Sequence, residues 1–168
     1  MPGEGVEIPV VGGTLKLTTD YPAIASVFEM VVLPGYDVGA HIHGYGEEIF
    51  YILEGELDLF AFEPADRSDP DWHNWKSAST GEGVVRAGPG SFMFVPAQCP
   101  HAFSNTTDRP AKMFFQSSVP GGHENYFWEL AELLAQTDGR PAPSASQELR
   151  SRWHIEQLTP LRQRDGVA

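Results

Sequence analysis

Two histidines separated by one residue, His41 and His43, stand in the stretch HIHGYGEE, which ends in the adjacent glutamates Glu47 and Glu48. Residues i and i+2 of a strand point to the same face of a sheet, so both imidazoles can reach one target if this segment is extended. Along the returning segment EEIFYILE, alternation with Phe50 places Glu48 on the same inner face and leaves Glu47 outside. Two neutral imidazoles and a carboxylate inside a sheet predict a site for a divalent metal ion, because buried ionisable groups are costly unless they are paired.

The same residues also fit a simpler interpretation, in which His41 and His43 are surface histidines on an edge strand and both glutamates are solvated. A second group of residues favours the metal site. In GPGSFMFVPAQCPHAFSN, His101 follows a proline-bounded turn at the start of another strand, and Asn105 comes four residues later. A ligand from a separate strand is what an enclosed site needs, whereas we expect Asn105 to serve the strand or a hydrogen bond behind the ligands.

Short strand-like segments, separated by Gly, Pro, Asn and Asp, must position these side chains. We predict strands at 6–10, 14–18, 25–33, 38–43, 48–53, 56–62, 84–87, 92–95, 101–105 and 112–117. Such a series is typical of an antiparallel sandwich or barrel. A closed or face-to-face arrangement is expected, because open edges invite aggregation.

Helical patterning begins only after this series. In HENYFWELAELLAQ, residues 127, 130, 131 and 134 are apolar and share one helical face, which predicts a packing helix. TDGRPAPSASQ is a predicted linker, and ELRSRWHIEQLTPL predicts a short helix or turn followed by an extended tail. We therefore divide the chain into a barrel at 1–120, with a polar insertion at 63–83, and a C-terminal part at 121–168 that packs on the barrel. Loops as long as 63–83 are often lids or binding loops, although some are simply mobile.

Composition limits the classes of partner. With 168 residues and 41% hydrophobic content, one compact domain with a core is expected. The formal charge of −12 disfavours nucleic acid and anionic membranes as partners. Cys99 is the only cysteine, so no internal disulfide can form, and we expect a buried, inert thiol. No long apolar run or leader is present, which favours a cytoplasmic, soluble protein.

The first motif segment resembles the first of the paired motifs of the cupin superfamily. That pattern reads G, five residues, HxH, three or four residues, E, six residues, G. The chain matches it throughout, with Gly35, His41, His43, Glu48 and Gly55.

The second segment resembles the other cupin motif, which reads G, five residues, PxG, two residues, H, three residues, N. Gly90, Pro96, His101 and Asn105 match it. Gln98 stands where the pattern has glycine. Glycine would ease a turn with positive φ, so the departure affects the expected geometry of this turn and leaves the ligand His101 intact.

The resemblance implies a double-stranded β-helix barrel, an all-β jelly-roll-like fold with short C-terminal helices. It also implies one metal ion held by His41, His43, Glu48 and His101. The segment SSVPGGHENYFWELAEL after the barrel is similar to that of quercetin-dioxygenase-like proteins with a single cupin domain. Such relatives imply a homodimer in which N-terminal strands extend a neighbour's sheet.

Three imidazoles and a carboxylate fill four positions of a six-coordinate ion and leave two open, for a substrate and O2. Fe, Mn, Ni or Co suits such a site better than Zn, which prefers four ligands but stays possible. By resemblance to flavonol dioxygenases, Glu48 is expected to be catalytic and to accept a proton from an enol or phenol.

Apolar side chains from the barrel strands are expected around the metal ion, although most of them would fill the core in any cupin barrel. The candidates for the substrate pocket are Phe28, Met30, Phe50, Ile52, Phe92 or Met93, Phe103 and Phe115. His73, between two tryptophans of the insertion, either contacts substrate over the barrel mouth or is an exposed loop histidine. His123 and His154 lie outside the motifs and receive a structural interpretation.

Three functions are compatible with these residues. The first is a metal-dependent dioxygenase of a small enolic, phenolic or diketone-like molecule. The second is a cupin isomerase, cyclase or decarboxylase that uses the ion as a Lewis acid without redox chemistry. The third is a non-catalytic cupin that binds a small molecule or metal.

Overall fold

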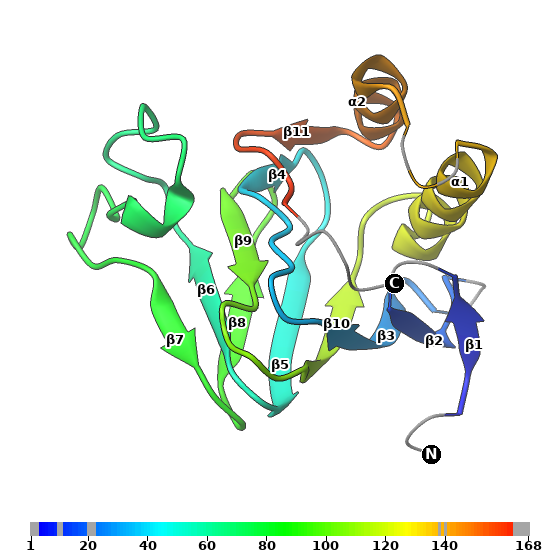
Figure 1. Ribbon diagram of the computed structural model, residues 1–168, viewed down its shortest axis with the longest axis horizontal. Helices are drawn as coiled ribbons and strands as arrows, with labels where there is room; N and C mark the ends of the chain where they lie inside the picture. The colour runs from blue at the N-terminus through cyan, green and yellow to red at the C-terminus, as the bar shows by residue number, and fades with distance from the viewer. Residues whose placement is uncertain (1–3, 10–11, 20–22, 138, 140, 163–168) are drawn as a thin grey trace.

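Two antiparallel sheets and two helices make up the computed structural model, which describes residues 4–9, 12–19, 23–137, 139 and 141–162 (Figure 1). In spatial order, the six-stranded sheet contains β1 (Val6–Ile8), β2 (Gly13–Leu17), β3 (Ser26–Val32), β10 (Ala111–Ser117), β5 (Glu48–Glu54) and β8 (Phe92–Val95). The five-stranded sheet contains β11 (Ile155–Gln157), β4 (His41–His43), β9 (His101–Ser104), β6 (Leu57–Ala61) and β7 (Val85–Ala87). The two sheets and the all-β class with short C-terminal helices confirm the predicted cupin-like barrel.

The core lies between the two sheets and follows the period-two alternation of their strands. Phe28 on β3, Phe50 on β5 and Phe115 on β10 face inward, and the ring of Phe115 stacks on the other two at centroid distances of 5.4 and 4.9 Å. Leu59 and Phe103 face them from the five-stranded sheet. The barrel is therefore filled by side chains at this level rather than left hollow.

All ten predicted strands are present, with small differences at their ends. The strand predicted at 38–43 shortens to β4, because side chains rather than strand carbonyls accept from the Gly39 and Ala40 amides. The Asp37 carboxylate accepts a hydrogen bond from the Gly39 amide, and the Thr159 hydroxyl accepts one from the Ala40 amide, both at 2.8 Å. Residue 10 of the first predicted strand lies outside the described residues.

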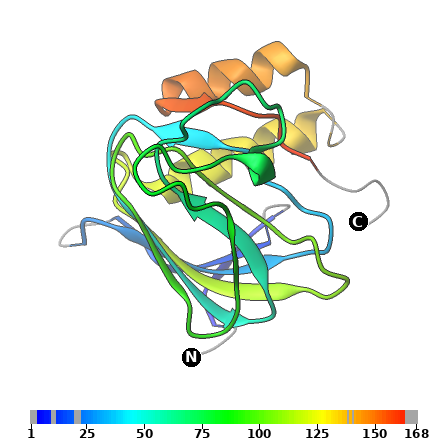
Figure 2. The ribbon, with the colours of Figure 1, turned by 90° about the vertical axis from the view of Figure 1, so that its left-hand side faces the viewer.

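The C-terminal part forms α1 (His123–Gln136) and α2 (Pro143–Arg152), which lie side by side at one end of the sheets (Figure 2). The linker prediction for residues 137–147 is partly wrong, because α2 begins at Pro143. Proline suits the first turn of a helix, where its missing N–H has no partner to lose. The tail after α2 is extended as predicted, and it contributes β11, which pairs with β4 and places Ile155 opposite His43.

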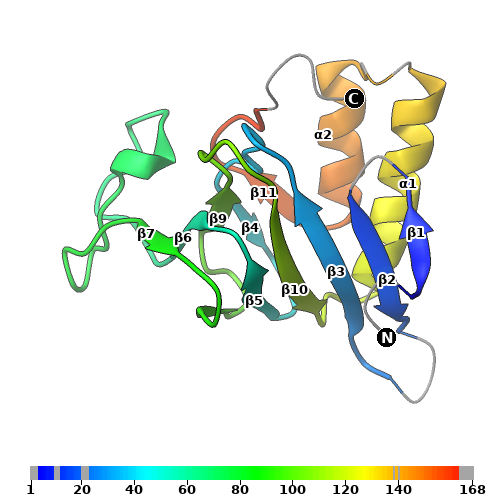
Figure 3. The same ribbon diagram turned by 60° about the horizontal axis from the view of Figure 1, so that its bottom comes forward.

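The insertion at 63–83 covers the outer face of the five-stranded sheet. Trp72 and Trp75 are buried there against Phe60 and Ala102, which alternate along their strands with residues of the main core. The indole N–H of Trp72 also donates a hydrogen bond to Asp37 at 2.9 Å. The insertion lies on the side of the molecule away from α1 and α2 (Figure 3), so among the alternatives left open by the sequence it is a packed cover for the sheet.

Neither of the two helices in the described part of the chain is long and apolar enough to cross a membrane. Strand β1 stands at one edge of the six-stranded sheet. An edge there is what the expected homodimer would need, and the dimer stays a prediction.

Candidate metal centre

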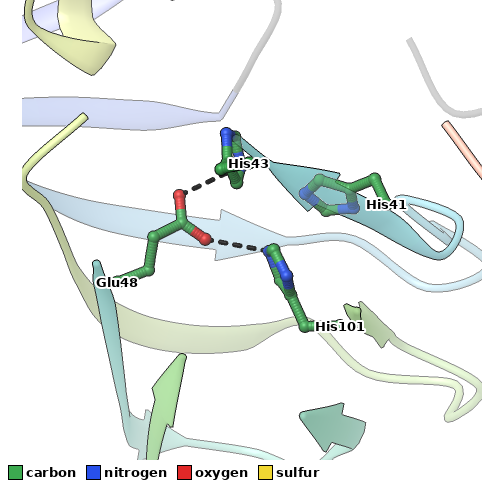
Figure 4. Close-up of side chains that lie close together, drawn as sticks. All are labelled: His41, His43, Glu48 and His101. Atoms are coloured by element: carbon green, nitrogen blue, oxygen red, sulfur yellow. Dashed lines mark ion pairs between the residues drawn. The ribbon is translucent and has the colours of Figure 1, made fainter. Parts of the chain in front are cut away.

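Four buried side chains converge inside the barrel, near the end that α1 and α2 cover. They are His41 and His43 from β4, Glu48 from the first position of β5, and His101 from the first position of β9 (Figure 4). One ligand atom from each lies within 4.8 Å of the others. Metal–nitrogen bonds of about 2.1 Å place ligands on opposite sides of an ion about 4.2 Å apart, so small side-chain movements would bring all four onto one ion.

Strand pairing explains why the four residues meet. His41 lies directly opposite His101 in the β4–β9 pair, and the rings are 4.2 Å apart between centroids. His41 and His43 are both buried while Ile42 between them is partly exposed, as expected for alternate positions of a strand. Glu48 is buried and Glu47 is exposed, so the alternation argument for the second of the two glutamates holds.

The hydrogen bonds of two imidazoles leave their Nε2 atoms available to a metal ion. Nδ1 of His41 donates to the carbonyl oxygen of Gly39 at 2.9 Å, and Nδ1 of His101 donates to that of Cys99 at 3.0 Å. A carbonyl only accepts, so in the neutral ring the proton is on Nδ1 and the lone pair on Nε2. Backbone partners of this kind orient metal-binding histidines in known sites.

Several buried polar atoms at this centre have no hydrogen-bond partner within the described part of the chain. They are both ring nitrogens of His43, Oε1 of Glu48 and Nε2 of His101. The Glu48 carboxylate oxygens lie 3.3 Å from His43 Nε2 and 2.9 Å from His101 Nε2, yet these pairs lack hydrogen-bond geometry. Buried polar atoms that face one another without pairing could all bind one cation between them, so the donor set fits a divalent metal ion.

The protonation states also suit metal binding. Burial and the neighbouring imidazoles lower the pKa of His41 well below its usual value, and burial lowers the pKa of His43 to about 4. Burial acts to raise the pKa of Glu48, but the imidazoles of His43, His101 and His123 outweigh it and hold that pKa well below the usual value. At neutral pH the site therefore offers the neutral rings of His41 and His43 and the ionised carboxylate of Glu48.

His123 is a site residue that the sequence interpretation missed. Its Nδ1 lies 3.2 Å from Oε1 of Glu48 and 2.9 Å from the hydroxyl of Ser117. Gly121 and Gly122 precede it with φ of 88° and 83°, a conformation that glycine adopts without strain, and they turn the chain so that the first residue of α1 faces the barrel. The Gly-Gly-His sequence directly after a strand was the available signal, but it lies outside both motifs.

A cavity of about 290 Å³ opens beside the four residues. Of the predicted pocket residues, Met30, Phe50, Phe103 and Phe115 line it. Helix α1 adds Tyr126, Phe127, Leu130 and Leu134, and α2 adds Arg150. The cavity is thus closed between the barrel and the two C-terminal helices, which the sequence interpretation treated only as packing elements.

The other predicted pocket residues lie elsewhere. Phe28 and Ile52 are buried in the core and do not line the cavity. The expectation for Phe92 is wrong, because alternation along β8 turns Met93 inward and leaves Phe92 61% exposed. The expectation that His73 contacts substrate is also wrong. Its ring bridges Asp71 and Ser104 at 2.7 and 2.8 Å on the outer face of the five-stranded sheet.

Residues 28–116 match the family model described as the cupin domain. The chain belongs to the cupin family. The match includes all four candidate ligands and ends before α1, so it covers neither His123 nor the helical wall of the cavity.

Several solved structures are similar to this cupin over part of their length. DMSP lyase DddQ from Ruegeria pomeroyi DSS-3 is 25% identical over 55% of this chain and 37% of its own, with a TM-score of 0.40. A predicted oxalate decarboxylase from Thermotoga maritima is 21% identical over 62% of this chain and 76% of its own, with a TM-score of 0.48. An uncharacterized conserved protein with a double-stranded β-helix domain from Klebsiella pneumoniae is 15% identical over 62% of this chain and 73% of its own, with a TM-score of 0.44. Among curated protein sequences, none matches.

The remaining residues of the second cupin motif support the backbone of this cupin. Asn105 is fully buried, and its amide donates to the carbonyl oxygens of Val32 and Arg109, so it serves the strands and turn rather than the ligands. Gln98 takes the glycine position with φ of 65°, and its backbone N–H donates a hydrogen bond to the carbonyl oxygen of His43. The turn that precedes His101 therefore keeps the glycine-like conformation without glycine.

Cys99 and His154 both have the surroundings of structural residues. Cys99 is partly buried, and burial raises the pKa of its thiol, as expected for an inert cysteine. His154 is exposed and its ring meets that of Tyr45 at 5.1 Å, away from the metal centre, which is consistent with a structural role.

Proposed function

We propose that this cupin is a metal-dependent dioxygenase of a small enolic or phenolic substrate, flavonol-like or diketone-like in its chemistry. The observation that carries the proposal is the arrangement of three imidazoles and one carboxylate at the wall of a mainly apolar, aromatic cavity. Such a cavity is large enough for a small molecule and keeps most of its surface away from water.

His41, His43, Glu48 and His101 would hold the ion, with Fe, Mn, Ni or Co favoured over Zn. When bound, the ion would supply Lewis acidity and open coordination positions for a substrate oxygen and for O2. The cavity lies on the side where His41, His43 and Glu48 reach its wall, whereas His101 is fully buried behind them. A substrate in the cavity would therefore approach from the side of His41, His43 and Glu48 rather than from the side of His101.

The chain's own residues have three tasks in this proposal. Glu48 accepts the substrate's enol or phenol proton at Oε1, the oxygen that has no hydrogen-bond partner within the described residues. His123, whose Nδ1 lies 3.2 Å from that oxygen and 2.9 Å from the Ser117 hydroxyl, packs beside the carboxylate and limits its movement. Phe50, Phe103 and Phe115 exclude water and orient a flat substrate by contact with their rings.

Oxygen consumption tests the proposal. Protein loaded in turn with Fe, Mn, Ni and Co is mixed with a panel of flavonols, diketones and catechols, and oxygen uptake and product mass are followed. We expect uptake with at least one metal and substrate, and its loss in the His101→Ala protein but not in His154→Ala, which changes a histidine outside the site. No uptake across the panel would contradict a dioxygenase, and turnover that persists without oxygen would select a non-redox isomerase, cyclase or decarboxylase.

A further inference from the structure

The cavity contains one permanent positive charge that does not belong to the metal centre. Among the described residues that line the cavity, Arg150 is the only arginine or lysine. It comes from α2, next to Leu149, which is buried against α1 and β11 and fixes this turn of the helix. Arg150 therefore lines the cavity from an element separate from the strands that carry the metal ligands, and it is itself partly buried.

Arg150 forms no ion pair within the described part of the chain, which distinguishes it from its neighbours. Arg152, two residues later on the same helix, contacts Glu129 at 2.7 Å and Glu148 at 3.8 Å at the surface. A cation left unpaired in a mainly apolar cavity is available to a ligand.

Two buried phenols surround this charge. Burial raises the pKa of Tyr126, and the nearby charge of Arg150 opposes that rise. Burial raises the pKa of Tyr36 to about 12, so its phenol keeps its proton and can donate a hydrogen bond. One contact to Tyr126 leaves most of the five guanidinium N–H groups free, and a planar carboxylate can accept two of them at once.

The charges along the cavity favour an anion. Glu48 is the only carboxylate among the described lining residues, and it already faces the imidazoles. A dication held by neutral histidines and one glutamate would leave the metal centre with a net positive charge. That centre and Arg150 would together make the cavity positive, although the formal charge of the whole protein is −12.

We propose that Arg150 binds a carboxylate of the substrate, so that the cavity takes a small phenolic or enolic acid rather than a neutral molecule. This inference rests on the proposed function in one respect, namely that the cavity is the substrate site. It assigns the arginine a role in specificity, in which the acid end of the substrate pairs with Arg150 while the phenolic or enolic oxygens face the metal centre.

A purely structural role for Arg150 makes different predictions. The guanidinium could serve only to tie α2 to Tyr126 of α1. In that case its removal would lower stability and weaken acidic and neutral ligands equally, and Tyr126→Phe would have the same effect.

Binding, measured without turnover, separates the two roles. Protein loaded with Zn²⁺ under nitrogen is titrated calorimetrically with three catechol acids of increasing spacer length, protocatechuate, homoprotocatechuate and dihydrocaffeate, and with the methyl ester of each. We expect one acid to bind about 10 to 100 times more tightly than its ester, because the ester cannot form the charge-assisted pair with Arg150. Arg150→Gln should bring that ratio close to one, whereas Arg152→Gln, which removes the same charge from the same helix, should keep it.

Tyr126→Phe is the second variant, and it keeps the guanidinium while removing its tie to α1. The acid preference should survive in this protein. The inference is overturned if no acid is preferred at any spacer length, if Arg150→Gln leaves the ratio unchanged, or if Tyr126→Phe abolishes it. An acid preference without oxygen uptake would remove the proposed dioxygenase and leave the Arg150 site standing.

Discussion

Replacing Asn105 by alanine should destabilise the fold strongly and leave the metal centre intact. The side chain is fully buried, and its amide donates to the carbonyl oxygens of Val32 at 2.8 Å and Arg109 at 2.7 Å. Its oxygen accepts hydrogen bonds from the amide and hydroxyl of Thr107 at 3.0 and 2.7 Å. Alanine removes all four bonds and leaves the buried Val32 carbonyl without this donor, at a cost of about 3–4 kcal/mol in the free energy of unfolding.

Urea denaturation followed by tryptophan fluorescence measures this cost. For a chain of this size, about 3–4 kcal/mol corresponds to a fall of roughly 10 °C in melting temperature. Thr107→Val is the matched control, because it removes hydroxyl bonds from the same turn but leaves the two donors of Asn105 in place, and it should cost about 1 kcal/mol. The metal content of Asn105→Ala protein should equal that of the wild type. Loss of metal with unchanged stability would refute the assignment of Asn105 to the backbone and place it at the metal centre.

Three further predictions concern other parts of the chain. Trp72→Ala should lower the free energy of unfolding by about 3–5 kcal/mol without changing the metal content, because the indole is buried against Phe60 on the outer face of the five-stranded sheet. Equal stability of Trp72→Ala and the wild type in urea would contradict this packing. The free energy of unfolding of the wild type should fall by about 2–3 kcal/mol as the pH rises from about 10 to about 12. A tyrosine of the unfolded chain ionises at about pH 10, whereas Tyr36 in the fold has a pKa of about 12. The stability that the raised pKa contributes is complete below about pH 10 and is lost across this interval. Tyr36→Phe should reduce this alkaline loss in denaturation curves at several pH values, and an unchanged loss would argue against it. Gln98→Gly should raise stability by about 0.5–1 kcal/mol by removing a side chain from φ of 65°, whereas a decrease would show that the glutamine contributes contacts of its own.

The barrel and its ligand cluster were accessible from the sequence because both depend on short-range rules. Period-two alternation selected Glu48 over Glu47 and put His41 and His43 on one face, and the structure agrees at each position. Alternation alone does not say which of two neighbours faces the core when both are apolar, and this is why Phe92 and Met93 were both candidates for the inward position that Met93 occupies.

The rest of the site depends on packing between segments far apart in the chain. His123 reaches Glu48 across seventy-five positions because two glycines turn the chain after β10, and no spacing rule connects the two residues. The place of the 63–83 insertion was equally hidden, since a polar sequence with two tryptophans is as compatible with a lid as with a cover for a sheet. The outward apolar residues Phe60 and Ala102, with which the tryptophans pack, decide between them.

The metal content of the purified protein tests the central claim most directly. Elemental analysis should find about one equivalent of a divalent transition metal in the wild type and in His73→Ala, whose histidine bonds to Asp71 and Ser104 outside the site. His101→Ala and Glu48→Gln, measured in the same way after confirmation that they are folded, should contain almost none. Equal metal content in His101→Ala, Glu48→Gln and the wild type would contradict the assignment of these side chains as the metal ligands.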